Sequence, residues 1–162
     1  MDELQILLIK QACSELIVRV HNYVDDFEHD KIVAMFAPDA VFGNAVVGGV
    51  LHGRDEIARY YDSKNRRVLG QHITTNIVID VVDPLHATGT SYFTFYFAGE
   101  GYTLPSPFDG PMAVGKYDDQ FVCIDGIWKF SSRTMANRFQ VGSLASYGLV
   151  DGVTDDPQQR VS

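Results

Sequence analysis

The stretch GQHITTNIVIDV (residues 70–81) marks the point at which the chain changes from helical to strand-like periodicity. Successive side chains of a β-strand point to opposite faces, so these residues divide into two sets. Apart from Thr75, one set is apolar and the other polar: Ile73, Ile77, Ile79 and Val81 against His72, Thr74 and Asn76. The polar set reaches no charged residue before Asp80, which is unusual for a face that meets water. His72 is therefore the first residue whose surroundings need an explanation.

Three helices are expected before this stretch. The first covers residues 3–27, where apolar residues recur at spacings of three and four: Ile6, Ile9, Cys13, Leu16, Val20, Val24 and Phe27. A short second helix fits residues 29–37 and ends before Pro38, because a proline disfavours helical geometry in the residue before it. A third fits residues 54–67, with acids in its first turn and bases in its last. A short strand is expected within residues 40–53.

Four long strands are expected from residue 70 onward, because aromatic and β-branched residues dominate there. They are HITTNIVIDVV (72–82), ATGTSYFTFYFAG (87–99), AVGKYDDQFVCI (113–124) and IWKFSSRTMANRF (127–139). Asp83-Pro84 turns the first into the second, and Asp125-Gly126 joins the last two in a tight hairpin of the primed kind. Helices followed by an antiparallel sheet indicate the α+β class, with the helices packed on one face.

One domain is expected over residues 1–140, followed by a C-terminal tail, 141–162, that is partly extended and partly disordered. The Pro- and Gly-rich stretch at residues 99–111 is too long for a plain turn. It is either a lid or mouth of a site or an excursion at the edge of the sheet.

Composition restricts the function classes. The chain has 162 residues and a formal net charge of -8, which opposes binding to nucleic acid or to anionic membranes. Its first residues lack the pattern of a secretory signal or a membrane span, so a cytoplasmic protein is expected. Cys13 and Cys123 form no C-x-x-C pattern and are interpreted as reduced packing residues.

Several landmarks together resemble a known family. They are VDDFEHDKIVAMFAPDAVF (24–42), GRDEI (53–57), GQHITTN (70–76), GKYDDQFV (115–122) and GIWKFSSR (126–133). Their order and spacing resemble the SnoaL-like branch of the nuclear transport factor 2-like superfamily, over roughly residues 5–138. The resemblance implies a cone of strongly curved antiparallel or mixed sheet with about three N-terminal helices, enclosing a pocket.

The resemblance also implies a pair of functional residues. Scytalone dehydratase and bile acid dehydratase, members of that superfamily, use an aspartate at the end of the first helix and a histidine on a strand. Asp25 and His72 occupy those places, and Arg133 matches an arginine of the bile acid enzyme. Other positions depart from the two enzymes, whose remaining tyrosine, histidine and aspartate groups are replaced here by Val20, Val24, Asn44, Phe95 and Phe97. Neither named reaction is therefore transferred to this chain.

An aspartate and a histidine are sufficient for proton-transfer chemistry. A neutral imidazole can take a proton from a carbon beside a carbonyl or give one to a leaving hydroxyl, and a carboxylate fixes its tautomer. Candidate substrate-binding residues, which could stabilise developing charge, are Asn44, Asn76, Tyr92, Tyr96, Tyr117 and Arg133. Helical-wheel arithmetic, however, puts Asp25 off the stripe marked by Val20, Val24 and Phe27, as for an acid on a solvated helix end.

The strand at 87–99 leaves two alternatives open. If its tyrosines share the face of His72, the site is aromatic with hydroxyl groups; if its phenylalanines do, the site is more apolar and the tyrosines serve a subunit interface. No metal is expected, because His21 and His29 beside the acidic cluster lack a completing ligand set. No nucleotide or flavin cofactor is expected either, because the corresponding loops are missing from the sequence.

The sequence thus predicts a cofactor-independent lyase or isomerase, dehydratase- or cyclase-like, that acts on a small hydrophobic carbonyl or ring-bearing compound. The alternative is a non-catalytic small-molecule-binding or assembly domain of the same fold. A homodimer or homotrimer is expected, without a nucleic-acid or membrane partner. The distance between Asp25 and His72 separates the two readings, because the enzyme requires the two side chains to meet.

Overall fold

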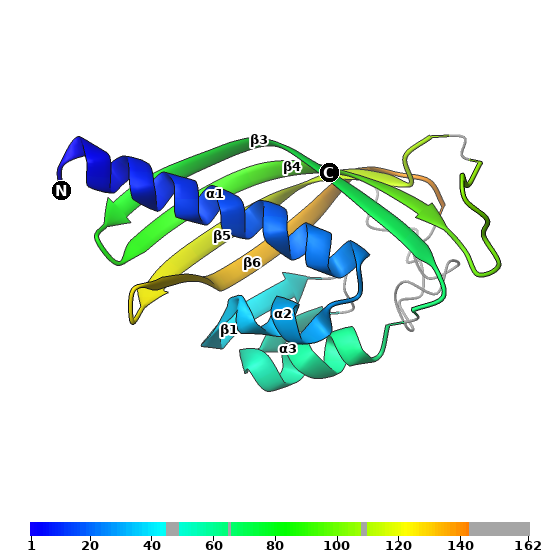
Figure 1. Ribbon diagram of the computed structural model, residues 1–162, viewed down its shortest axis with the longest axis horizontal. Helices are drawn as coiled ribbons and strands as arrows, with labels where there is room; N and C mark the ends of the chain where they lie inside the picture. Colours follow the sequence, from blue (N-terminus) through cyan, green and yellow to red (C-terminus); the bar gives the residue numbers. More distant parts are fainter. Residues whose placement is uncertain (45–48, 65, 108–109, 143–162) are drawn as a thin grey trace, which may run out of the picture.

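The computed structural model describes residues 1–44, 49–64, 66–107 and 110–142 of the chain. Its three helices are α1 (Glu3–Asp25), α2 (His29–Ala34) and α3 (Gly53–Asp62). Figure 1 shows α1 lying across one face of a curved sheet, with α2 and α3 beside strand β1 (Phe36–Asn44). None of the described helices is long and apolar enough to cross a membrane.

Helix α1 begins at a capping box and ends before a residue with a left-handed backbone. The Asp2 carboxylate accepts from the Gln5 backbone N–H at 2.7 Å, and the Gln5 side chain accepts from the Asp2 N–H at 3.0 Å, which is a capping box. The helix ends at Asp25, slightly before the expected Phe27, because Phe27 has a left-handed backbone (φ 55°) that breaks the helical hydrogen-bond ladder.

The other two helices are also shorter than expected. Helix α2 ends at Ala34, and strand β1 (Phe36–Asn44) begins almost at once, so the backbone is extended well before Pro38. Helix α3 ends at Asp62 rather than Arg67, and the Ser63 hydroxyl donates to the Tyr60 carbonyl at 2.7 Å. That bond satisfies one of the carbonyls left open at the helix end.

The sheet is mixed and has six strands. After β1 come β2 (Gly49–His52), β3 (Leu69–Asp83), β4 (His86–Ala98), β5 (Ala113–Ile124) and β6 (Ile127–Gln140), in the spatial order β2-β1-β6-β5-β4-β3. Strand β1 runs parallel to β6, and all other neighbours are antiparallel. The expected α+β architecture of N-terminal helices on a curved, mixed sheet is confirmed. The primed turn is confirmed as well, because Asp125 and Gly126 both have positive φ (51° and 78°).

A bulge in β3 changes which of its side chains share a face. Asn76 has φ 53°, and the pairing with β4 shifts between Thr75 and Val78. The extra residue reverses the alternation, so His72 and Thr74 lie on the same face as Ile77, Ile79 and Val81 rather than opposite them. The expectation of one apolar and one polar face along all of 70–81 was therefore wrong. Along the inner face, the polar residues His72 and Thr74 come first and the apolar residues Ile77, Ile79 and Val81 follow.

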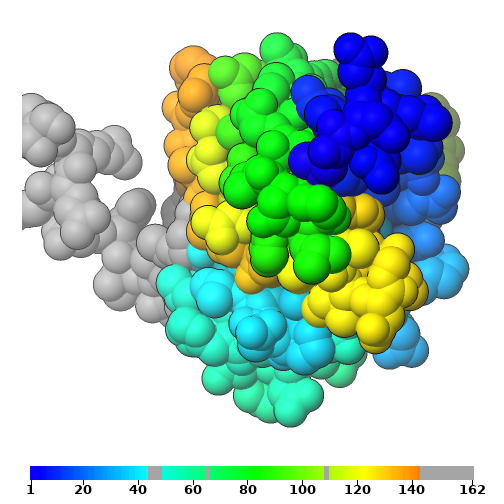
Figure 2. All heavy atoms as spheres, turned by 90° about the vertical axis from the view of Figure 1, so that its left-hand side faces the viewer, coloured from blue at the N-terminus to red at the C-terminus, as the bar shows by residue number. Residues whose placement is uncertain are grey.

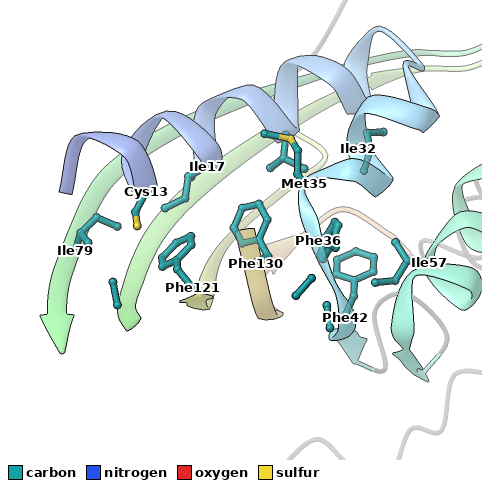
Figure 3. Close-up of a cluster of buried hydrophobic side chains, with 14 of the residues drawn as sticks. Cys13, Ile17, Ile32, Met35, Phe36, Phe42, Ile57, Ile79, Phe121 and Phe130 are labelled. Carbon is teal, nitrogen blue, oxygen red and sulfur yellow. The ribbon is translucent and has the colours of Figure 1, made fainter. Parts of the chain in front are cut away.

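The main core lies between α1 and this inner face. Figure 3 shows Cys13 and Ile17 of α1 pointing toward Ile79 of β3 and Phe121 of β5. The core continues through Phe130 and Phe36 to Ile57 of α3, all fully buried or nearly so. On the face in Figure 2, the N-terminal half of α1 packs beside the β3–β4 turn. The C-terminal end of α1, which is Asp25, lies at the other end of the helix, away from the β3–β4 turn (Figure 1).

Glycines in β4 and β5 allow aromatic rings to pack against the strands. A Cβ at Gly115 would come within 2.5 Å of Phe93 Cε1 and closer still to the Ala136 carbonyl oxygen. Gly115→Ala should therefore lower the free energy of unfolding by about 1–3 kcal/mol, the usual cost of overpacking. Urea unfolding followed by circular dichroism measures this value.

Gly99→Ala is the matched control, because a Cβ at Gly99 has no atom within 4 Å. Its free energy of unfolding should change by less than about 0.5 kcal/mol. Equal unfolding midpoints for the two variants would contradict the packing role of Gly115.

Candidate active site

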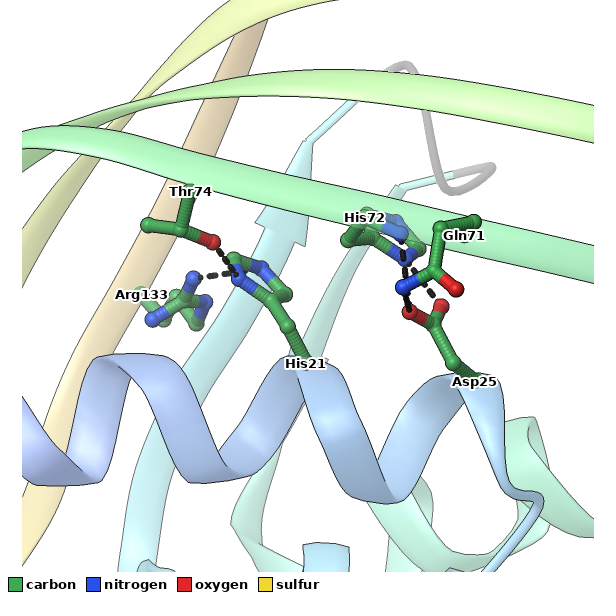
Figure 4. A network of polar contacts seen from close by, with 6 residues as sticks. All are labelled: His21, Asp25, Gln71, His72, Thr74 and Arg133. Carbon is green, nitrogen blue, oxygen red and sulfur yellow. Dashed lines mark hydrogen bonds and ion pairs between the residues drawn. The ribbon is translucent and has the colours of Figure 1, made fainter.

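Asp25 and His72 meet where the end of α1 crosses the start of β3. The Asp25 carboxylate Oδ1 lies 2.5 Å from His72 Nδ1, and Oδ2 accepts from the His72 backbone N–H at 2.8 Å. Gln71 Nε2 donates to the same Oδ2 at 3.1 Å, as Figure 4 shows. The two side chains are 9% and 13% exposed. The contact that the enzyme hypothesis requires is therefore present.

The helical-wheel objection to Asp25 was wrong for a geometric reason. The buried line on α1 runs through Ile9, Cys13, Ile17 and His21, each four residues after the last. One more step of four reaches Asp25, which lies one helical turn after His21 on the same side of the helix. Val20 is buried as well, but Val24 is only partly buried and Phe27 lies beyond the end of the helix, so the stripe drawn through these three residues was placed to one side of the true inner line.

The contact with Asp25 determines the protonation pattern of a neutral His72. Because a carboxylate oxygen accepts hydrogen bonds, the proton of a neutral His72 is assigned to Nδ1, which donates it to Asp25 Oδ1. Nε2 then carries the free lone pair, and no residue in the described part of the chain forms a hydrogen bond with it. This arrangement is the one in which a histidine acts as a general base while a carboxylate orients it.

A second histidine, His21, lies directly beside His72. The two rings are 4.9 Å apart between centroids and nearly parallel, with 5° between their planes. His21 Nδ1 lies 2.5 Å from Thr74 Oγ1, and its Nε2 lies 3.0 Å from the Arg133 NH2 group. Burial, and next the positive charge of Arg133, hold the pKa of His21 well below its usual value. His21 is therefore neutral at pH 7.

Behind His21 lies a buried ion pair. Arg133 of β6 donates to Asp119 Oδ2 of β5 at 3.1 Å, and the side chains are 2% and 0% exposed. Burial raises the pKa of Asp119 to about 6, although Arg133 opposes the shift. The guanidinium stacks over Tyr117, with 3.8 Å from its carbon to the ring centroid. Burial also raises the pKa of Tyr117.

The phenylalanines of β4, not its tyrosines, share the face of His72. In the antiparallel pairing His72 lies opposite Phe95, and their rings are 4.4 Å apart. Phe93 lies opposite Thr74 on the same face and contacts the Tyr117 ring. The wall beside the imidazole is therefore apolar, which decides between the two alternatives for this strand.

Tyr92 and Tyr96 do not belong to the site. They lie opposite Thr75 and Gln71, whose side chains point to the outer face. The exposed ring of Tyr92 packs under Arg138, 4.9 Å from the guanidinium carbon. The expectation that the two tyrosines contact a substrate beside His72 is corrected, because strand alternation puts them on the other side of the sheet.

The remaining candidates divide into three cases. Tyr117 and Arg133 are on the inner face but buried, with 4% and 2% exposure. Asn76 is exposed at the bulge in β3. The side chain of Asn44 lies outside the described residues, as does most of the C-terminal tail.

Sequence reasoning missed the role of His21 and Asp119. His21 was considered only as a metal ligand, and within the described residues no three His, Cys, Asp or Glu side chains gather closely enough to hold a metal ion. Its spacing of four from Asp25 was the available signal, because residues four apart share one side of a helix. Nothing in the sequence distinguished Asp119 from its exposed neighbour Asp118 except strand alternation.

A family model for the SnoaL-like domain matches residues 5–134. The chain belongs to the SnoaL-like family. The resemblance seen in the sequence landmarks is thereby confirmed. No curated protein matches this SnoaL-like chain by sequence.

Solved structures share the fold of this SnoaL-like domain. A scytalone dehydratase-like protein from Novosphingobium aromaticivorans is 21% identical with a TM-score of 0.69, and the match covers 86% of this chain and 93% of the other. A protein of unknown function from Mycobacterium tuberculosis is 26% identical with a TM-score of 0.68, covering 84% and 79%. A hexachlorocyclohexane dehydrochlorinase from Novosphingobium barchaimii is 16% identical with a TM-score of 0.69, covering 86% and 93%.

The neutral state of His21 predicts a pH effect on stability. Unfolded His21 binds a proton below about pH 6.5, but the folded protein does not, so its contribution to stability is complete above that pH and is lost as pH falls. Relative to His21→Gln, the wild-type protein should lose about 1.4 kcal/mol of unfolding free energy for each pH unit below about 6.5.

Urea unfolding of both proteins at pH 7.5 and pH 5.5 measures the difference, and titrating groups remote from His21 cancel in the comparison. The same difference at both pH values would contradict the neutral, buried state of His21.

Proposed function

We propose that this SnoaL-like protein is a cofactor-independent lyase or isomerase in which His72 is the general acid and base and Asp25 orients it. The observation that carries the proposal is the 2.5 Å contact between Asp25 Oδ1 and His72 Nδ1, together with an Nε2 that bonds to none of the described residues. A histidine held in this way can remove a proton from carbon and return it elsewhere.

An elimination illustrates the step. His72 Nε2 takes a proton from the carbon beside a carbonyl, and the electrons of that C–H bond form a C=C bond as the bond to a leaving hydroxyl breaks. The hydroxyl takes the proton from His72 and leaves as water, so the imidazole returns to its neutral form. Asp25 stabilises the intermediate imidazolium. In an isomerisation, His72 returns the proton to another carbon.

The surroundings of His72 support an apolar substrate. Phe93 and Phe95 form the wall beside the imidazole, and no charged side chain of the described residues other than Asp25 contacts its ring. Such a wall suits a small hydrophobic carbonyl or ring-bearing compound, which binds by burying apolar surface against the aromatic rings rather than by ion pairs.

The names of two structural neighbours fit this chemistry. A dehydratase removes water and a dehydrochlorinase removes hydrogen chloride, and both reactions are eliminations. At 21% and 16% identity these neighbours share the fold alone, so the proposal rests on the residues of this chain.

One observation favours the second candidate, a non-catalytic ligand-binding domain. Tyr117 and Arg133, the expected donors to a developing oxyanion, are buried, and Arg133 bonds Asp119 and His21. A site without such a donor would lose much of the electrostatic stabilisation on which enzymes depend.

Deuterium exchange tests the proposal without knowledge of the exact substrate. The protein is incubated in D2O with a panel of β-hydroxy ketones and hydroxylated ring ketones, and the recovered compounds are examined by mass spectrometry. The wild-type protein should incorporate deuterium into, or remove water from, at least one compound. His72→Ala should lower that rate by about 10²- to 10⁴-fold, the usual contribution of a positioned general base.

His86→Ala is the matched control. His86 Nδ1 contacts Asp83 at 3.0 Å in the same chemical pairing, but both side chains are about half exposed. This variant should keep the wild-type rate. A His72→Ala variant that exchanges deuterium as fast as the wild type would exclude His72 as the general base. A wild-type protein that binds panel compounds but accelerates exchange in none of them would exclude the enzyme and leave the binding domain.

A further inference from the structure

His21 is a buried histidine that the proposed chemistry does not use. It lies one helical turn before Asp25 on α1, and its ring is stacked on that of His72 at 4.9 Å with 5° between the planes. Figure 4 shows the two imidazoles side by side. His21 contacts Thr74 and Arg133, whereas His72 contacts Asp25. Parallel stacking restricts rotation of the His72 ring, because a turn about its side-chain bonds would drive the ring into His21.

Both nitrogens of His21 are occupied. Arg133 has only donors, so Nε2, which lies 3.0 Å from its NH2 group, must be an acceptor. The proton of a neutral His21 therefore lies on Nδ1, and it is donated to Thr74 Oγ1 at 2.5 Å. With its lone pair engaged by a cation, His21 can act neither as a base nor as a cation beside His72.

The group that holds His21 is itself fixed. Arg133 is bonded to Asp119 and enclosed between the rings of Tyr117 and Phe130, with distances of 3.8 and 4.7 Å from its guanidinium carbon to their centroids. Only 2% of the residue is exposed. Because Asp119 balances the charge of Arg133, the carboxylate of Asp25 is left to balance a proton gained by His72.

We propose that His21 is a positioning residue, held by Thr74 and Arg133, that keeps the His72 ring in the plane in which Nδ1 faces Asp25. Arg133 then acts through His21 rather than as a donor to the substrate. The catalytic consequence rests on the proposed function of His72, whereas the ring geometry does not. The two can therefore be tested separately.

Thr74→Val is the first test, because valine keeps the shape of threonine and removes the acceptor for His21 Nδ1–H. Thr75→Val is its control, since Thr75 is the next residue on the outer face of β3. NMR of ¹⁵N-histidine-labelled protein at pH 7 identifies the protonated nitrogen of each ring. It also measures how fast the His72 Nδ1–H proton exchanges with water.

The wild-type protein and Thr75→Val should show His21 protonated on Nδ1 and a slowly exchanging His72 Nδ1–H. In Thr74→Val that exchange should be about 3- to 10-fold faster, the factor expected for one neutral hydrogen bond. Equal exchange rates in both variants, or a wild-type His21 protonated on Nε2, would overturn the proposal.

Arg133→Lys provides a second test if Thr74→Val does not fold. It keeps a positive charge for Asp119 but shortens the reach to His21, and Arg138→Lys on the outer face of the same strand is its control. The same acceleration is expected for Arg133→Lys alone, and its absence in a folded protein would overturn the proposal.

Turnover of a compound found by deuterium exchange tests the catalytic consequence. Thr74→Val should lower kcat by about 3- to 10-fold with KM unchanged, because ring orientation affects the proton transfer rather than binding. An unchanged kcat with accelerated Nδ1–H exchange would overturn the catalytic part. Full turnover in His72→Ala would instead exclude the proposed function and leave the NMR result on His21 intact.

Discussion

The buried ion pair between Arg133 and Asp119 is the interaction on which the polar interior depends. The two residues are directly opposite each other on β5 and β6, so strand pairing alone brings the charges together. Neither charge can remain unpaired in this interior, because a buried charge without its partner costs several kcal/mol. Arg133 then extends to His21 and so fixes α1 against the sheet at the height where Asp25 reaches His72.

Helix α1 and strand β3 match each other because both change from apolar to polar along one line. On α1 the inner line runs from Ile9 to Asp25, with apolar residues first. On β3 the inner line runs from His72 to Val81, with polar residues first, because the bulge at Asn76 joins the two sets on one face. Where the elements cross, polar therefore meets polar at one end and apolar meets apolar at the other.

Part of the site could be predicted from the sequence and part could not. The pairing of Asp25 with His72 was expected from landmarks that resemble a family, and the two side chains do meet. The face of β4 could not be chosen, because both of its faces are aromatic and alternation alone does not say which one is buried. The end of the first helix was predicted two residues too late, because Phe27 continues the apolar spacing although its own backbone leaves the helix.

By itself, the sequence determined the α+β class, the order of helices and strands, and the primed turn at Asp125-Gly126, because periodicity and turn chemistry are local properties. Only the tertiary structure decided what His72 faces. That choice depends on one left-handed residue, Asn76, and on the register between strands far apart in the chain. A shift of one residue moves a side chain to the other face of a sheet, so the surroundings of His72 are set by long-range pairing and not by its neighbours in sequence.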